Sequence, residues 1–245
     1  RYSRHTVLPE IGERGQKLLS SAEVTIIGLG GLGTVISDAL VRCGVGTVNI
    51  VDRDVVEISN LQRQTLYDEK DIGDKKADAA YHRLKSINSD VDIQKYILNV
   101  GPSNIEDLIE KADIVLDATD NIDTRYVINE ACVKQYVPWI FTSVMGTYGM
   151  TLNIFPRKGP CLRCLLPDEP HSESFQNGSE AGILFTLPRV MGNISATEAV
   201  KYLVGDEPRE ELLTVDLWKN DYMLTSVARN ENCVCCVKED FEYIK

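Results

Sequence analysis

Residues 24–33 read VTIIGLGGLG, and this stretch decides the fold. Its first half is the apolar, β-branched run of a buried strand, and an amphipathic helix follows over 32–43. The glycines between them are Gly28, Gly30, Gly31 and Gly33. Glycines at this spacing let the backbone approach a phosphate at the positive end of a helix. The stretch therefore predicts a nucleotide-binding turn, which by itself most often indicates NAD.

Strands and helices alternate along the chain around this turn. Apolar runs predict strands at 24–30, 47–52, 91–98, 113–119 and 137–143. Amphipathic stretches predict helices over 32–43, 75–87, 104–111 and 124–135. This alternation requires right-handed crossovers, so we predict an α/β, Rossmann-like fold with a mostly parallel sheet and helices on both faces.

The pattern changes after residue 143. A strand at 150–155 precedes a polar stretch over 156–178, and helical periodicity returns over 188–204. Strands at 212–217 and 223–229 indicate a hairpin around a polar turn at 219–221. We expect these strands to extend the sheet in antiparallel fashion. The expected organisation is a single domain, 1–245, with an N-terminal arm and helix (1–21), a nucleotide-binding core (22–143) and the extension (144–245).

The charge of the chain limits its partners. Its 245 residues include 26 Lys and Arg against 37 Asp and Glu, a formal net charge of −11. This excess of negative charge opposes binding to polyanions, so neither nucleic acid nor an anionic membrane is an expected partner. No apolar run approaches the roughly 20 residues that span a bilayer, and no secretory signal is visible. We expect a cytoplasmic protein.

Polar side chains follow the predicted strands at the edge where open α/β sheets bind ligands. Asp52 ends the second strand, where its carboxylate can bind a ribose hydroxyl or cap the turn. Asn60, Arg63 and Lys76 supply an amide and two cations, which suit a triphosphate better than a dinucleotide; ordinary solvated charges are the alternative. ATP is therefore favoured over NAD. Asp120, after the fourth strand, is a candidate Mg²⁺ ligand.

Four of the seven cysteines form two C-x-x-C pairs that lie about seventy positions apart. They are Cys161, Cys164, Cys233 and Cys236. This set matches a structural zinc site that closes a long loop, and two redox-active dithiols are the alternative. Cys43 and Cys132 fall on apolar helix faces, where buried thiols are common.

Six segments together resemble the ThiF/MoeB family of E1-like adenylating enzymes. They are RYSRH at 1–5, GLGGLG at 28–33, VDRDVVEISNLQRQ at 51–64, GDKK at 73–76, LDATDN at 116–121 and CLRC at 161–164. The resemblance covers nearly the whole chain. It implies adenylation of a carboxylate by ATP and Mg²⁺, with release of pyrophosphate, in a homodimer.

The resemblance also implies a role for each matching residue. Asp52 would hold the ribose, the phosphates would be held by Asn60, Arg63 and Lys76, and Mg²⁺ would be bound by Asp120. The glycine turn, Asp54 and Asn121 complete the implied nucleotide site. Arg4 would reach into the ATP site of the neighbouring subunit. The family also has a zinc site at the positions of the two C-x-x-C pairs.

One loop departs from the family pattern. Many members carry a catalytic cysteine shortly before an E-A-G triplet, whereas this chain reads Gln176-Asn-Gly178-Ser-Glu-Ala-Gly182 there. Gly178 stands at the cysteine position, and no cysteine lies between Cys164 and Cys233. We therefore expect no internal thioester or acyl-disulfide step, and transfer of the acyl group to an external nucleophile.

Two kinds of carboxylate fit this reaction. The favoured substrate is the C-terminal Gly-Gly of a ubiquitin-like sulfur carrier protein. The alternative is a small-molecule carboxylate in cofactor biosynthesis, such as the guanylylpyridinol precursor of the [Fe]-hydrogenase cofactor, with a separate acyl-accepting protein. A non-catalytic nucleotide-binding scaffold is a weaker alternative, because all the candidate phosphate and Mg²⁺ residues are present, and an NAD-dependent oxidoreductase is weaker still.

Overall fold

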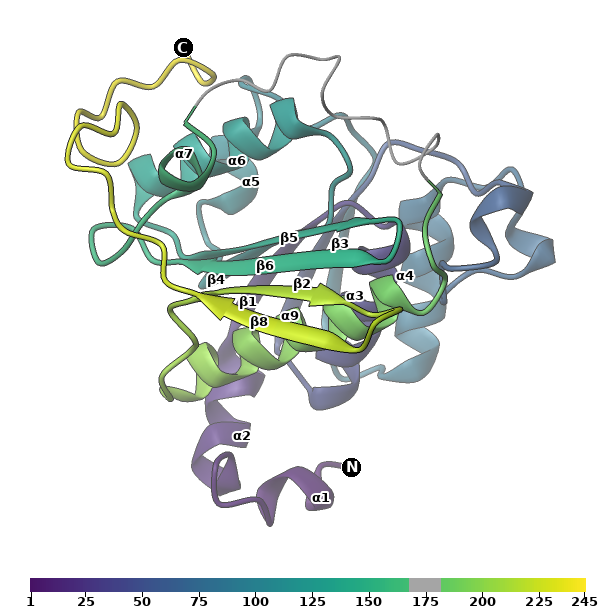
Figure 1. Cartoon of the computed structure of the whole chain (residues 1–245). Helices are drawn as coiled ribbons and strands as arrows, with labels where there is room; N and C mark the ends of the chain where they lie inside the picture. Colours follow the sequence, from purple (N-terminus) through teal and green to yellow (C-terminus); the bar gives the residue numbers. More distant parts are fainter. Residues whose placement is uncertain (168–181) are drawn as a thin grey trace.

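The computed structural model describes residues 1–167 and 182–245 and centres on one eight-stranded sheet (Figure 1). The strand order is β3-β2-β1-β4-β5-β6-β7-β8, parallel from β3 to β5 and antiparallel from β5 to β8. The strands are β1 (Glu23–Ile27), β2 (Thr47–Val51), β3 (Asp92–Tyr96), β4 (Ile114–Asp117), β5 (Trp139–Met145), β6 (Tyr148–Ile154), β7 (Leu212–Asp216) and β8 (Asp221–Thr225). The predicted fold class is confirmed.

The strand order reverses next to β1. β2 and β3 lie on one side of it, whereas β4 and β5 lie on the other. Val24 pairs with Val48 of β2 and with Ile114 of β4, so β1 has a parallel neighbour on each side. The loops after β1 and β4 consequently leave the same edge of the sheet side by side. Ligands bind at this position in open α/β sheets.

Helices cover both faces of the sheet (Figure 1). One face packs against α3, α4 and α9, and the other against α5 and α6. The helices are α1 (Ser3–Thr6), α2 (Gly12–Ser21), α3 (Gly31–Cys43), α4 (Lys76–Ile87), α5 (Ile105–Ile109), α6 (Ile122–Gln135), α7 (Leu162–Leu165) and α9 (Leu187–Val204). Two short 3₁₀ helices, η1 (Ile58–Asn60) and η2 (Glu69–Asp71), lie between β2 and α4.

Successive residues of β1 enter different cores, as the two-residue period of a strand requires. Ile26 belongs to the cluster under α3 and α9, and Ile27 to the cluster that includes Trp139 and faces α6. Burial of each such side chain contributes about 1.5 to 3 kcal/mol. β3, in contrast, is an edge strand in which only Ile93 is buried, and it is shorter than the predicted 91–98.

The turn of the C-terminal hairpin lies earlier in the chain than predicted. β8 already begins at Asp221 and ends at Thr225, so the turn occupies residues 217–220 instead of 219–221. Asn220 has a φ of +57°, a left-handed conformation that asparagine tolerates. The Asp216 carboxylate accepts the backbone N–H groups of Trp218 (3.2 Å) and Lys219 (3.3 Å), which closes the turn early.

Among residues 1–167 and 182–245, no helix has both the length and the apolar character needed to cross a membrane.

Candidate active site

The glycine turn joins β1 to α3. Gly28 has a φ of +95°, and a Cβ there would lie 2.6 Å from the carbonyl oxygen of Ala118, which follows β4. A Cβ at Gly33 would overlap the Gly28 carbonyl oxygen. Packing alone requires these two glycines. At Gly30 the nearest atom to such a Cβ is Gln64 Nε2 at 3.9 Å, so space is open at the N-terminus of α3, where phosphates bind.

Asp52 follows β2 and connects it to the glycine turn. Its carboxylate accepts the backbone N–H of Leu29 at 2.7 Å and that of Asp54 at 2.7 Å. The turn-capping role is therefore present. The side chain is partly exposed at the same edge of the sheet as the glycine turn, so a ribose hydroxyl can still bind to the carboxylate.

Lys76 is the first residue of α4, and its side chain is only 9% exposed. Its ammonium group donates to Asp54 Oδ2 at 3.1 Å, and its backbone N–H donates to the Asp54 carbonyl oxygen at 3.0 Å. The Asp54 side chain is 55% exposed and also lies 3.6 Å from Arg53 Nε. Lys76 is thus held toward the segment that carries Asp52. A buried ammonium group with one exposed counter-charge is suited to binding a phosphate.

Asn60 and Arg63 lie in and just after η1. The buried Asn60 accepts the Glu57 N–H at 3.0 Å, so this amide shapes the turn. Arg63 donates to the Ser59 carbonyl oxygen at 3.1 Å and has no ion-pair partner among the described residues. A Cβ at Gly31 would lie 3.6 Å from Arg63 Cγ, which shows that the arginine stem packs on the glycine turn. An arginine whose guanidinium group has no carboxylate partner among the described residues is therefore held against the turn by its stem.

Asp120 and Asn121 lie in the loop after β4. Asp120 is exposed and forms no hydrogen bond or ion pair with the described part of the chain, which leaves its carboxylate available for Mg²⁺. Asn121 is the N-cap of α6, and its side-chain oxygen accepts the Thr124 N–H at 2.8 Å. The resemblance implies a nucleotide-binding role for Asn121, and this capping role was not predicted.

A buried ion pair that the sequence did not predict lies beneath this loop. Asp117 accepts from Arg125 Nε at 3.0 Å and from the backbone N–H and hydroxyl of Thr119 at 2.9 and 2.6 Å. Burial raises the pKa of Asp117, while the Arg125 charge lowers it. Arg125 also donates to the Thr119 carbonyl oxygen at 2.6 Å, so the pair holds the loop that carries Asp120. The sequence holds one signal for this pair. Arg125 lies near the N-terminus of a helix, where the helix dipole disfavours a cation.

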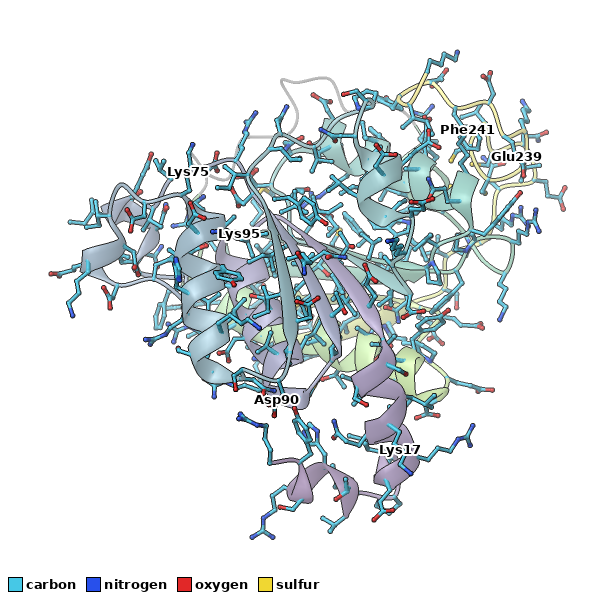
Figure 2. The ribbon with its side chains drawn as sticks, turned by 180° about the vertical axis from the view of Figure 1, so that it is seen from behind. Lys17, Lys75, Asp90, Lys95, Glu239 and Phe241 are labelled. Carbon is cyan, nitrogen blue, oxygen red and sulfur yellow. The ribbon has the colours of Figure 1, made fainter. Side chains whose placement is uncertain are left out.

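Arg4 lies at the opposite edge of the sheet. It belongs to α1, whose neighbour Tyr2 accepts a hydrogen bond from Asn88, beyond the end of α4, at 2.8 Å. Figure 2 shows Asp90 beside the N-terminal helices, whereas Lys75, at the start of α4, lies at the far end of that helix. Arg4 therefore does not join the other predicted residues in its own chain.

The four cysteines of the C-x-x-C pairs form one cluster, with all Sγ atoms within 4.8 Å of one another. The Sγ atoms of Cys161 and Cys233 are 3.6 Å apart, as are those of Cys164 and Cys236. Four sulfur atoms around one zinc ion, with Zn–S bonds of about 2.3 Å, would lie about 3.8 Å apart. The thiols thus fit a tetrahedral zinc ion, and their convergence favours metal over two separate dithiols.

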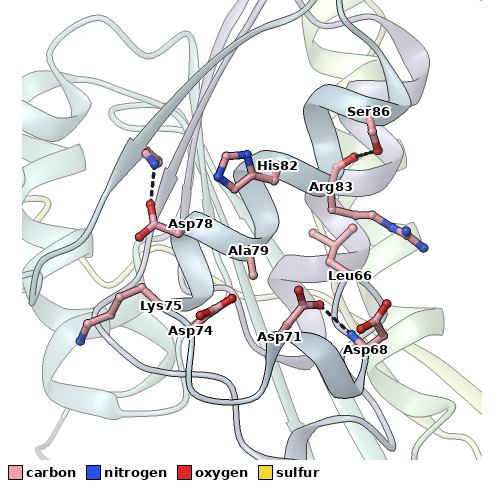
Figure 3. A pocket seen from close by; sticks show the side chains of 11 residues that line it. Leu66, Asp68, Asp71, Asp74, Lys75, Asp78, Ala79, His82, Arg83 and Ser86 are labelled. Carbon is pink, nitrogen blue, oxygen red and sulfur yellow. Dashed lines mark hydrogen bonds and ion pairs between the residues drawn. The ribbon is translucent and has the colours of Figure 1, made fainter.

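A separate polar cavity of about 650 Å³ lies beside α4 (Figure 3). Its lining includes Asp71, Asp74 and His82, and Asp78 pairs there with Lys95. No residue predicted for the nucleotide lines this cavity. Apart from Arg4, the residues predicted for the nucleotide lie instead at the edge of the sheet beside the glycine turn. The chemistry of their side chains, and not the volume of the cavity, identifies the candidate site.

The model of the ThiF family matches residues 2–235. The chain belongs to the ThiF family. This ThiF-family chain is 42% identical over 248 residues to the sulfur carrier protein ThiS adenylyltransferase of Bacillus subtilis, covering 100% of this chain and 73% of that protein. It is 36% identical over 246 residues to the sulfur carrier protein adenylyltransferase of Thermus thermophilus, with coverages of 98% and 91%. The chain is an adenylyltransferase, and the predicted family and enzyme class are confirmed.

Solved structures support the fold of this ThiF-family chain. The crystal structure of E. coli MccB has a TM-score of 0.83 at 22% identity and covers 96% of this chain and 71% of that one. The E. coli MccB structure with ATP has a TM-score of 0.81 at 22% identity, with coverages of 91% and 69%. Gly178 and the loop around it lie outside the described residues.

Proposed function

We propose that this enzyme uses ATP and Mg²⁺ to convert the C-terminal Gly-Gly carboxylate of a ubiquitin-like sulfur carrier protein into an acyl-adenylate. Two relatives are named for sulfur carrier proteins, and the match to the Bacillus subtilis protein covers 100% of this chain. The observation in the structure that carries the proposal is the placement of two cations: the Lys76 ammonium group reaches Asp54 in the segment after β2, and the stem of Arg63, which has no ion-pair partner among the described residues, packs on the glycine turn.

The chemistry needs charge neutralisation more than proton transfer. A carboxylate is already an anionic nucleophile at neutral pH, so it can attack the α-phosphate of ATP without a general base. The new carboxylate–phosphorus bond forms as the bond between the α- and β-phosphates breaks, and pyrophosphate leaves. Cations and backbone N–H groups that face the phosphates stabilise this transition state. Arg63, Lys76 and the Gly30 N–H are the groups that we assign to this task.

The remaining residues orient these groups or hold the rest of the nucleotide. Asp52 holds the ribose and the Leu29 N–H, Asp54 directs the Lys76 ammonium, and Asn60 shapes the segment before Arg63. Mg²⁺ held by Asp120 would neutralise further phosphate charge. Asn121 caps α6 and thereby supports the same loop.

Arg4 is assigned to the ATP site of a second subunit in a homodimer. Its position at the sheet edge opposite to the glycine turn supports this assignment, because it cannot serve its own site. Mixing Arg4→Ala with Asp120→Ala subunits tests it, and we expect partial recovery of activity in verified heterodimers.

Three further assignments belong to this proposal. Cys161, Cys164, Cys233 and Cys236 bind one structural zinc ion, which the spacing of their thiols supports. Residues 1–245 form a single domain, since one sheet continues from the nucleotide-binding core into the antiparallel extension. A cytoplasmic location accords with the use of ATP and with seven cysteines that form no disulfide.

A small-molecule carboxylate, passed on to a separate acyl-accepting protein, is the second candidate substrate. The glycine at position 178 favours it, because no cysteine stands there to take over the acyl group.

ATP–pyrophosphate exchange distinguishes the two substrates. The purified protein is offered a Gly-Gly-terminated sulfur carrier, the same carrier amidated at its C-terminus, and a panel of heteroaromatic carboxylates. We expect exchange with the free carrier and none with the amide. Exchange with a small acid alone would replace the carrier by that acid, and exchange with neither, despite ATP binding, would contradict both candidates.

A further inference from the structure

Tyr67 lies behind the glycine turn and contacts two parts of the proposed phosphate site. It is 7% exposed, and its hydroxyl lies 3.0 Å from the Leu29 carbonyl oxygen and 3.3 Å from the Lys76 carbonyl oxygen. Its single proton is therefore shared between the two carbonyl groups. Leu29 belongs to the glycine turn and Lys76 begins α4, so one side chain connects the two segments.

The contact with Leu29 also orients a phosphate-binding group. In a trans peptide the C=O and the following N–H point in opposite directions, so the carbonyl that faces Tyr67 turns the Gly30 N–H away from it. Within the described chain this N–H has no acceptor, and the space beside Gly30 is open. The Leu29 N–H is fixed as well, because it donates to Asp52 at 2.7 Å. An unpaired N–H at a helix N-terminus is suited to a phosphate oxygen.

The surroundings of the hydroxyl keep it protonated. Burial raises the pKa of Tyr67, and the negative charges of Asp52, Asp71 and Asp54 raise it further. The phenol therefore remains a hydrogen-bond donor over the whole neutral pH range.

We propose that Tyr67 is a positioning residue for the phosphates of ATP: its hydroxyl fixes the Gly30 N–H and the start of α4, with Lys76, at a set spacing. The inference rests on the proposed function, because it takes this edge of the sheet as the ATP site. Tyr67 acts through the Leu29 and Lys76 carbonyl groups, and contact with the nucleotide is not required.

Calorimetric titration of the full chain with ATP or adenosine, in the presence of Mg²⁺, tests this role. In Tyr67→Phe, which loses only the hydroxyl, we expect the Kd for ATP to rise about tenfold. The Kd for adenosine should stay within about twofold, because adenosine has no phosphates to position. A hydroxyl with a merely structural role would lower the thermal midpoint and leave the ratio of the two Kd values unchanged, which would overturn the proposal.

Tyr81→Phe is the matched control. Tyr81 lies on α4, and its hydroxyl has no hydrogen-bond partner in the described part of the chain. We expect both Kd values to match the wild type. A rise in the Kd for ATP equal to that of Tyr67→Phe would attribute the effect to the general loss of a hydroxyl and would contradict a specific role for Tyr67.

A double variant tests the connection to Lys76. In a Lys76→Ala background, Tyr67→Phe should weaken ATP binding by only about threefold, the part that remains through the Gly30 N–H. An undiminished tenfold effect would refute the connection. Pyrophosphate exchange by the wild type tests the proposed function independently: without exchange that function fails, while the ratio of Kd values still decides the role of Tyr67. A wild-type chain that binds no ATP would contradict both.

Discussion

Arg63 and Lys76 are held in different ways, although both are assigned to the phosphates. The Lys76 side chain is 9% exposed and paired with Asp54, so its loss would leave that carboxylate with only its exposed ion pair to Arg53 and would open a space at the start of α4. Arg63 is partly exposed and makes one hydrogen bond, to the Ser59 carbonyl oxygen. Arg63 is consequently the residue whose removal separates catalysis from folding most clearly.

We expect Arg63→Ala to reduce adenylation at least about 100-fold, the loss typical of one group that stabilises charge in a transition state. Exchange activity and the thermal midpoint are measured together, and the midpoint should stay near that of the wild type. Arg83→Ala is the control, because Arg83 is an exposed arginine of α4 outside the proposed site. A thermal midpoint that falls together with activity in Arg63→Ala would indicate a structural role.

Cys43 predicts a pH dependence of stability. Burial at the end of α3 raises the pKa of its thiol from 9.0 to about 11. The stability contributed by the protonated thiol is present below pH 9 and is lost as the pH rises to about 11, because the unfolded chain ionises first. Over this range we expect the free energy of unfolding to fall by up to about 3 kcal/mol more in the wild type than in Cys43→Ala. The free energy of unfolding is measured by urea titration at each pH. An equal fall with pH in the wild type and in Cys43→Ala would contradict this assignment.

At the scale of elements, α6 depends on its first residues. Asn121 caps the helix, and Asn121→Ala should lower the free energy of unfolding by about 1 kcal/mol in urea denaturation. Asn121→Asp is the matched control, because an aspartate oxygen can still accept the Thr124 N–H and interacts favourably with the helix dipole. If Ala and Asp variants were equally stable, capping would not be the role of this side chain.

How much of the fold could be predicted depended on whether the signal was local. The β1–glycine–α3 unit was predictable because the strand, turn and helix signals are contiguous in sequence. The position of the hairpin turn was predicted wrongly, because the Asp216 side chain and the left-handed Asn220 close the turn early. Neither effect can be recognised from the pattern of hydrophobic residues in the sequence. The edge strand β3 was predicted too long, since few of its residues are buried.

The candidate site was predictable where its residues lie in motifs. Lys76 reaches the Asp52 segment, and Arg63 reaches the glycine turn, as expected from their positions after the strands. The Asp117–Arg125 pair was not predicted, because its members are eight positions apart and meet only when α6 packs under the loop. The positioning role of Tyr67 could not be predicted, because the sequence alone does not distinguish such a tyrosine from an ordinary core residue.

At the scale of the molecule, the cysteine cluster joins the start of α7 to the C-terminal segment. These two parts of the chain are about seventy residues apart, and Arg163 strengthens their contact by pairing with Glu242 at 3.1 Å. Closing so long a loop costs entropy, which a bound metal ion can offset.

Metal analysis should therefore give about one zinc ion per chain, and chelation should lower the thermal midpoint. Cys233→Ser should lose the metal. Cys235→Ser should keep it, because Cys235 is buried beside the cluster but is not one of the four converging thiols. A metal-free protein with unchanged stability would refute the zinc assignment.

The proposed reaction transfers an adenylyl group, and not a phosphoryl group, to the carrier carboxylate. The most direct test incubates enzyme and Gly-Gly-terminated carrier with ATP labelled at either the α- or the γ-phosphate. We predict that the α-label appears on the carrier as an acid-stable, hydroxylamine-sensitive adduct, while the γ-label appears only in pyrophosphate. Label on the carrier from the γ-phosphate, with release of ADP, would contradict adenylation of the carrier.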